Sequence, residues 1–207
     1  MNENILHKSL LAFTLALLVW SGMHPKDRFT WLLEVLPVMI GLVILTVTYT
    51  RFKLTSLVYL LLSLHGAILM IGGHYTYAEM PLFNWLRDAF DLGRNYYDRL
   101  GHFAQGFVPA ITTREILLRR SPLQPGKWLA FLVVCVCLAI SAGYELIEFG
   151  VALATGEAAE AFLGTQGDVW DTQWDMLLAL SGAISALVLL GKYHDLSLRR
   201  VAGKPKG

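Results

Sequence analysis

The chain has 207 residues, of which 55% are hydrophobic and only 16% are charged, with a formal net charge of +1. Soluble domains carry about 25% charged residues, so this deficit excludes an ordinary soluble domain and indicates an integral membrane protein. We therefore expect membrane lipid as a partner and no nucleic acid. Cys135 and Cys137 share one apolar run at a spacing of two, which puts them on different sides of a helix and predicts neither a disulfide nor a metal clip.

Six apolar stretches predict membrane-spanning helices, because a span needs about 20 apolar residues. They are expected at about residues 10–23, 29–49, 54–73, 97–118, 128–153 and 170–190. The strands of a membrane barrel would be about 10 residues long with alternating polarity, and that pattern is absent. The prediction is an all-α fold, a polytopic bundle of six transmembrane helices forming a single membrane domain over residues 1–207. The small residues between Ser181 and Ala186 predict close helix packing.

The segment MPLFNWLRDAFDLG, which follows the third apolar stretch, predicts a short amphipathic helix. Pro81 suits the first helical position and Gly93 suits a C-terminal cap. Such a helix is expected to lie in the outer membrane interface. Its apolar stripe would consist of Leu82, Phe83, Leu86 and Phe90.

The basic residues predict that both termini are cytoplasmic. With the termini on one side, that side carries twelve of the 17 Lys and Arg residues, and an excess of these residues marks the cytoplasmic side. Only Glu3, Glu115 and Asp195 of the 16 acidic residues lie on that side. The outer side, with thirteen acids against five bases, is left with a net charge of about −8. The five outer bases are Lys26, Arg28, Arg87, Arg94 and Arg99.

Three of the predicted helices carry ionisable side chains at the same outer depth. Each group has spacings of three or four residues, which place it on one face of its helix. A charge near the centre of a spanning helix costs about 2.5–3.5 kcal/mol and usually faces the bundle interior. We therefore expect one acidic site, open to the outer face. Its members would be Asp98 and His102 in the fourth helix, Glu145 and Glu148 in the fifth, and Asp168, Asp171 and Asp175 at the start of the sixth.

Carboxylates this close together cannot all stay ionised unless a cation neutralises them. The mixture of imidazole and carboxylate predicts a divalent metal ion as cofactor, with Mg²⁺, Mn²⁺, Ca²⁺, Zn²⁺ and Fe²⁺ all compatible. Glu148 or Asp171 would serve as the general base. The predicted metal ligands are Asp98, His102, Glu145 and Asp175.

Each group also has a structural interpretation that stays open. Asp98 and His102 could form an ion pair at a helix start, and Asp168 could be only an N-cap. Glu145 and Glu148 could pair with Arg94 or Arg99. For four residues the sequence leaves open whether they join the site or lie outside it, namely His65, His74, Glu79 and Asp168.

Two polar residues lie deeper in the predicted spans. For His65, in the middle of the membrane, a hydrogen-bonded packing role is favoured over a proton relay. Glu34, in the outer third of the second span, could be neutralised by Lys26 or Arg28.

The motifs YDRLGHFAQGF, AGYELIEF and GTQGDVWDTQWDM resemble the signature of YjdF-type bacterial inner-membrane proteins over nearly the whole chain. This resemblance implies a fold and an inner-membrane location rather than an activity. A looser similarity connects the chain to VanZ-like membrane proteins, which are associated with glycopeptide-antibiotic resistance, and implies an envelope-facing site. The arginine that VanZ-like proteins carry before the last acidic stretch has no clear equivalent here. The matching positions are Asp98, Arg99, His102, Phe103, Glu145, Asp171 and Asp175.

Three classes of function fit these features. The first is a metal-dependent hydrolase or transferase that acts on a lipid or lipid-linked envelope molecule. The second is an ion- or proton-coupled transporter, which the apolar inner halves of the fifth and sixth stretches (131–138 and 177–190) disfavour. The third is a non-catalytic envelope scaffold.

Overall fold

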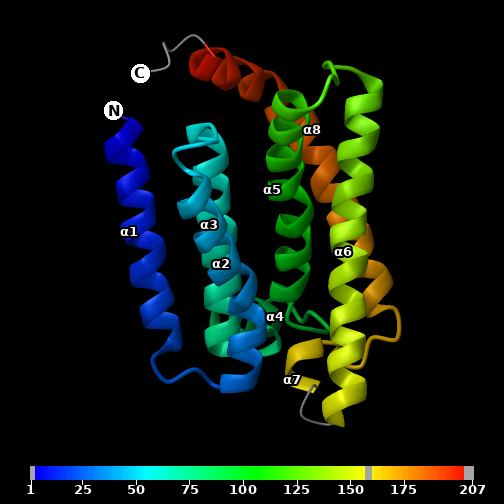
Figure 1. The fold of residues 1–207 in the computed structure, drawn as a ribbon. Coiled ribbons are helices and arrows are strands. Elements are labelled where there is room, and N and C mark those ends of the chain that lie inside the picture. Colours follow the sequence, from blue (N-terminus) through cyan, green and yellow to red (C-terminus); the bar gives the residue numbers. More distant parts are fainter. Residues whose placement is uncertain (1–2, 157–159, 203–207) are drawn as a thin grey trace.

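The computed structural model describes residues 3–156 and 160–202. Within these residues the regular structure consists of α-helices and one short 3₁₀ helix, with no strand, which confirms the all-helical class. The long helices lie side by side as a bundle, and the first and last described residues lie at the same end of it (Figure 1).

The elements follow one another in a simple order. The long helices are α1 (Glu3–Gly22), α2 (Arg28–Thr48), α3 (Ser56–Tyr75), α5 (Tyr97–Arg120), α6 (Lys127–Thr155) and α8 (Asp171–Ala202). The short ones are η1 (Tyr77–Glu79), α4 (Pro81–Ala89) and α7 (Glu160–Leu163). Within the described residues, five helices are long and apolar enough to cross a membrane, namely every long helix except α5. The chain is therefore a membrane protein with several spanning helices.

Helix α1 begins at Glu3, before the apolar stretch that starts near residue 10. Its polar first turns are accommodated because other elements supply hydrogen-bond partners. His7 is buried, with Nδ1 lying 2.9 Å from the Tyr49 hydroxyl and Nε2 lying 2.9 Å from the Ser56 hydroxyl. These contacts attach α1 to the end of α2 and to the first residue of α3.

Helix α4 has the predicted proline in its first turn and leaves large apolar side chains exposed, among them Leu82 and Trp85. Its end differs from the prediction. Asp91, with φ 51°, takes the left-handed position, and the Leu92 N–H donates to the Arg87 carbonyl at 2.9 Å, as in a Schellman cap. The prediction that Gly93 caps this helix is therefore wrong.

Helix α5 lies in the middle of the bundle and packs against α3, α6 and α8 (Figure 1). Its contact with α8 is a close approach of two backbones. A Cβ added at Gly106 would lie 1.8 Å from the Ala179 carbonyl oxygen, and one at Gly182 would lie 2.1 Å from the Phe103 carbonyl oxygen. The close packing predicted for the small residues around Gly182 is thus confirmed, and these glycines set the distance between α5 and α8.

A buried ion network joins α5 to α8 and to the start of α3 near the chain termini. Glu115, which is fully buried, accepts hydrogen bonds from the Thr55 N–H at 2.9 Å and from Arg119 Nη1 at 2.6 Å. Arg114 Nη1 lies 2.9 Å from Nδ1 of His194. Because arginine can only donate, Nδ1 accepts and Nε2–H of His194 donates to Glu115 at 3.1 Å. These matched contacts give the network a structural role.

Candidate acidic site

Two arginines, Arg94 just before α5 and Arg99 in its first turn, connect the aspartates at and just before the start of α8. Asp171 Oδ1 accepts hydrogen bonds of 2.7 Å from Nη1 of Arg94 and from Nη2 of Arg99. Asp168 Oδ2 lies 3.4 Å from the first arginine and 3.0 Å from the second. Arg99 Nη1 also donates to Asp175 Oδ1. Both guanidinium groups are buried, so they fix the positions of three carboxylates on α8 and its entry loop.

The loop that enters α8 is folded onto the start of α5. The side-chain amide of Gln166 makes two 2.9 Å hydrogen bonds to the backbone of Asn95, one to its N–H and one to its carbonyl. Arg94 Nη2 donates to the Gly164 carbonyl at 3.1 Å. Gly164 and Gln166 have φ values of 62° and 49°, in the left-handed region. This backbone course carries Asp168 toward the two arginines, and Asp168 Oδ1 accepts the N–H two residues further on at 2.9 Å.

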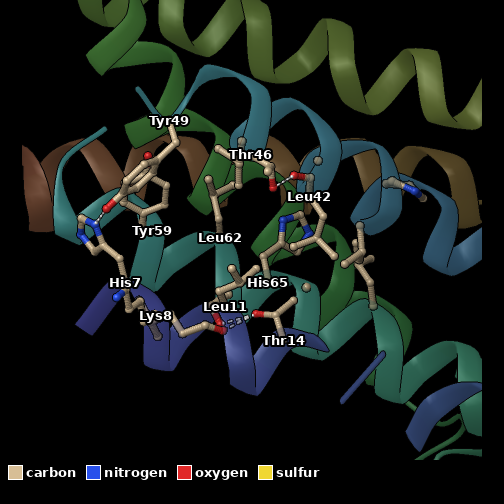
Figure 2. Close-up of a pocket in the computed structure, with 18 of the residues that line it drawn as sticks. His7, Lys8, Leu11, Thr14, Leu42, Thr46, Tyr49, Tyr59, Leu62 and His65 are labelled. Atoms are coloured by element: carbon tan, nitrogen blue, oxygen red, sulfur yellow. Dashed lines mark hydrogen bonds between the residues drawn. The ribbon is translucent and has the colours of Figure 1, made fainter. Parts of the chain in front are cut away.

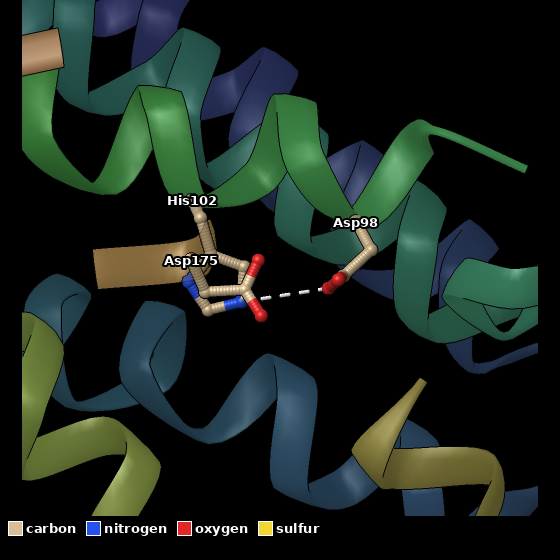
Figure 3. A group of neighbouring side chains, drawn as sticks. All are labelled: Asp98, His102 and Asp175. Atoms are coloured by element: carbon tan, nitrogen blue, oxygen red, sulfur yellow. Dashed lines mark ion pairs between the residues drawn. The ribbon is translucent and has the colours of Figure 1, made fainter. Parts of the chain in front are cut away.

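Asp98, His102 and Asp175 point into one space between α5 and α8 (Figure 3). Each offers one possible ligand atom, and these atoms lie within 4.8 Å of one another. Nε2 of His102 is 3.4 Å from Asp98 Oδ1 and 3.8 Å from Asp175 Oδ1. All three residues are buried. The structure thus brings together three of the four residues predicted as metal ligands.

The fourth predicted ligand, Glu145 on α6, lies on the other side of the imidazole ring. Its Oε1 is 3.8 Å from Nδ1 of His102, and Gln105 Oε1 is 3.1 Å from the same nitrogen. Two buried carboxylate oxygens, Glu145 Oε1 and Asp98 Oδ2, have no hydrogen-bond partner in the described part of the chain. A buried polar atom left without a partner costs about 1–3 kcal/mol, so these oxygens are where a further cation, proton or water would be stabilised.

A polar cavity of about 140 Å³ lies beside this cluster, between α2, α3, α5 and α6. Its wall includes Asp98 and His102 from α5, and Glu148 from α6. Glu34 on α2 also reaches it and accepts a hydrogen bond of 3.1 Å from the Tyr144 hydroxyl. Carboxyl groups from three helices therefore meet at the cavity.

A family described as "Predicted membrane protein (DUF2238)" matches residues 6–196 of the chain. The chain belongs to this family. The protein named "Inner membrane protein YjdF" from Escherichia coli (strain K12) is 51% identical over 196 residues, which cover 95% of this chain and 93% of that protein. No solved structure matches the chain. The resemblance to YjdF-type proteins is confirmed, and together with the apolar helices it identifies an inner-membrane protein.

Tyr77 is a cavity residue that the sequence did not reveal. Its ring lies between Gly72 of α3 and Gly101 of α5, where added Cβ atoms would be 2.4 Å and 2.9 Å from ring carbons. Its buried hydroxyl lines the cavity and has no hydrogen-bond partner among the described residues. Burial raises the pKa of Tyr77 well above its ordinary value, so the phenol stays a neutral donor. In the sequence, only Gly72 and Gly101 point to this arrangement, because a glycine in a helix can mark a place where another group approaches closely.

Two of the residues left open by the sequence lie outside the site. His74 Nδ1 is 3.0 Å from the Ser21 carbonyl oxygen, and the ring packs against Trp20. Glu79 forms an ion pair with Lys26. Lys26 therefore pairs with Glu79 and not with Glu34. Among the described residues, Glu34 accepts its hydrogen bond from the Tyr144 hydroxyl rather than from Lys26 or Arg28.

The other open residues lie at or beside the site. Asp168 belongs to the arginine cluster and also fills the capping position of a turn. His65 lines the cavity, but its buried Nε2 has no partner among the described residues, so the hydrogen-bonded packing role is wrong for that nitrogen. Arg94 and Arg99 pair with aspartates rather than with Glu145 or Glu148.

Proposed function

We propose that the acidic site binds a divalent metal ion and that the protein uses it as a hydrolase or transferase on a lipid or lipid-linked envelope molecule. The observation that carries this proposal is the buried group of Asp98, His102 and Asp175, whose ligand atoms lie within 4.8 Å of one another. A set of one imidazole and two carboxylates suits Zn²⁺, Fe²⁺ or Mn²⁺.

The charge balance of the site supports a bound cation. The site and its cavity hold seven carboxyl groups but only two guanidinium groups, those of Arg94 and Arg99, which contact aspartates alone, so positive charge is in deficit. The seven are Glu34, Asp98, Glu145, Glu148, Asp168, Asp171 and Asp175.

The two ring nitrogens of His102 suggest separate roles for the residues around it. Asp98 and Asp175 both lie near Nε2, so the metal would bind on that side. Glu145 and Gln105 lie near Nδ1. We therefore assign Gln105 to orienting the imidazole through Nδ1–H, with Glu145 beside the same nitrogen rather than among the metal ligands.

Glu148 is the better of the two predicted general bases. Asp171 already accepts two short hydrogen bonds from arginines, so its carboxylate is not available to take a proton from water. Glu148 lines the cavity, next to Asp98 and His102. A divalent ion would polarise a substrate oxygen or acidify a bound water, and Glu148 would accept the released proton.

Metal binding by purified protein tests the proposal. Asp98→Asn, His102→Gln and Asp175→Asn are each expected to weaken Mn²⁺ or Zn²⁺ binding by more than about 100-fold, because outer-shell partners alone contribute about 10–100-fold. Glu145→Gln should weaken binding by only about 10-fold. Isothermal titration and elemental analysis would measure this.

Asp88→Asn is the matched control, because Asp88 is an exposed acid on α4 that pairs with Arg87. This variant should bind metal as the wild type does. Folded wild-type protein that neither contains nor binds a divalent ion would contradict the proposal. Variants at Asp98, His102 and Asp175 that bind the metal as tightly as the control would contradict it too.

We also propose that α5 crosses the membrane as a sixth span. Its 24 residues correspond to roughly 36 Å at 1.5 Å per residue, which exceeds a hydrocarbon core of about 30 Å. Its low apolar content is compatible with crossing because its charged residues, such as Arg99, Arg114 and Glu115, are buried against other helices. Helix α4 would lie in the outer interface, with Leu82, Trp85 and Phe90 toward the lipid.

This topology predicts opposite labelling at the two ends of α5. In a background with Cys135 and Cys137 replaced by serine, Asp88→Cys should react with an impermeant maleimide in spheroplasts. Gln124→Cys, in the exposed loop between α5 and α6, should react only in inverted vesicles. Labelling of both positions from one side would contradict a sixth span, and the reverse pattern would contradict cytoplasmic termini.

A further inference from the structure

A second pocket, separate from the acidic site, lies between α1, α2 and α3 (Figure 2). Its volume is about 610 Å³, within the range of about 300–1,000 Å³ that small-molecule ligands occupy. Most of its wall surface is apolar, with Leu11, Leu42 and Leu62 along its length. Leu11 at its edge is 44% exposed, so the pocket is a groove that opens sideways to the surface facing the bilayer.

The two ends of the groove differ in polarity. The end near the chain termini is lined by His7, Lys8, Tyr49 and Tyr59 (Figure 2). Lys53 adds a second cation there, since its ammonium lies 3.3 Å from the Asn4 side-chain oxygen and 5.3 Å from the centre of the Tyr49 ring. The lining residues within the described part of the chain include no carboxylate.

The opposite end of the groove reaches the polar cavity. Pro37, His65 and Leu69 line both spaces. Beyond them lie the carboxyl groups of Glu34 and Glu148. An anionic head group would be repelled at this end and attracted at the lysine end, so the charges give the groove one preferred direction.

The length of the groove matches one leaflet. From Tyr59 to Leu69 it follows ten residues of α3, or roughly 15 Å at 1.5 Å per residue, which is half of a hydrocarbon core of about 30 Å. A hydrocarbon chain that enters at the lysine end and fills the groove would therefore end near the bilayer centre, beside Leu69.

We propose that this groove binds an anionic phospholipid from the leaflet on the side of the termini. The phosphate lies at Lys8 and Lys53, and one acyl chain lies along α1, α2 and α3 as far as Leu69. The site is independent of the metal, and it takes an intact lipid as a bound ligand rather than as a reactant. Anionic lipids are enriched in the cytoplasmic leaflet, where juxtamembrane lysines attract them.

Gly41 provides a direct test, because it lines the groove and a Cβ added there meets nothing within 4 Å. Gly41→Phe fills the groove without a backbone clash. Gly191→Phe on α8 is the matched control, since a Cβ at Gly191 also meets nothing within 4 Å. Thr46→Trp, at an exposed position on the groove wall, is a second blocking variant that carries the test if Gly41→Phe does not fold.

The experiment uses phosphatidylcholine nanodiscs that contain a small fraction of phosphatidylglycerol with a photoreactive group in its acyl chain, in the presence of EDTA. Peptide mapping should recover the label around Leu11, Leu42 and Leu62. In a blocking variant with a wild-type melting temperature, the amount of label in these peptides should fall at least about tenfold below that of the wild type. In Gly191→Phe it should stay at the wild-type level. Lys8→Gln should reduce the preference for phosphatidylglycerol over phosphatidylcholine about fivefold.

Two results would overturn the proposal. One is groove labelling that persists in both blocking variants. The other is equal labelling of the wild-type groove by photoreactive phosphatidylcholine and phosphatidylglycerol. Because EDTA removes divalent ions and the readout is a lipid adduct, failure here is distinguishable from failure of the metal site.

Discussion

Gly106→Leu is expected to prevent α5 and α8 from packing and to leave little folded protein. A Cβ at this position would lie 1.8 Å from the Ala179 carbonyl oxygen and 2.5 Å from its carbon. Ordinary carbon–oxygen contacts are about 3.3–3.6 Å, so the two backbones would have to separate. Overpacking in a core typically costs about 1–3 kcal/mol, and here the cost should exceed that range because the same interface aligns Arg99 with Asp171 and Asp175.

Thermal unfolding in detergent would measure this effect, with a melting temperature lowered by about 10 °C or more, at about 2–4 °C per kcal/mol for a chain of this size. Gly191→Leu on α8 is the control, because a Cβ there meets nothing within 4 Å. The control should melt within a few degrees of the wild type. Equal stability of the two variants would mean that the backbones of α5 and α8 do not approach as described.

Arg99→Gln is expected to cost about 3–5 kcal/mol, because removing one member of a buried ion pair leaves the other charge without compensation. The guanidinium group of Arg99 contacts Asp168, Asp171 and Asp175, and two of these aspartates are buried. Arg99→Lys should recover only part of the loss, since an ammonium group cannot reproduce the planar fork that reaches several carboxylates.

Unfolding of Arg99→Gln should be compared with that of Arg87→Gln. Arg87 pairs with Asp88 at the surface, and exposed pairs contribute only about 0–1 kcal/mol. The double variant Arg99→Gln with Asp175→Asn should lose less unfolding free energy than the two single variants lose together. The reason is that the neutral amide at position 175 no longer needs a cation beside it. If Arg99→Gln is no more costly than Arg87→Gln, the arginine does not hold the acidic site together.

The spacing of the acids predicted which helix faces meet but not how their side chains pair. Intervals of three and four residues place Asp98 with His102, and Glu145 with Glu148, on single helix faces, and these side chains do meet in the interior. Spacing gives no information on how neighbouring helices are rotated. The position of Arg99 among the aspartates of α8 therefore became visible only in the structure.

Residues that reach the cavity from elements distant in the sequence escaped prediction for the same reason. Tyr77 belongs to a short 3₁₀ helix outside the predicted spans, and its ring reaches the interior only because Gly72 and Gly101 leave space for it. Glu34 has a tyrosine on α6 as its partner, 110 positions away in the chain. His194, which belongs to the ion network with Glu115 and not to the cavity, lies beyond the last predicted span at 170–190, because α8 continues to Ala202.

The most direct test of a metal at the acidic site is a structure of the protein with Mn²⁺, recorded with anomalous scattering. We expect one strong peak within about 2.0–2.6 Å of Asp98, Asp175 and Nε2 of His102. A well-ordered site that shows no peak among these residues, or a peak confined to another part of the molecule, would contradict a metal site here.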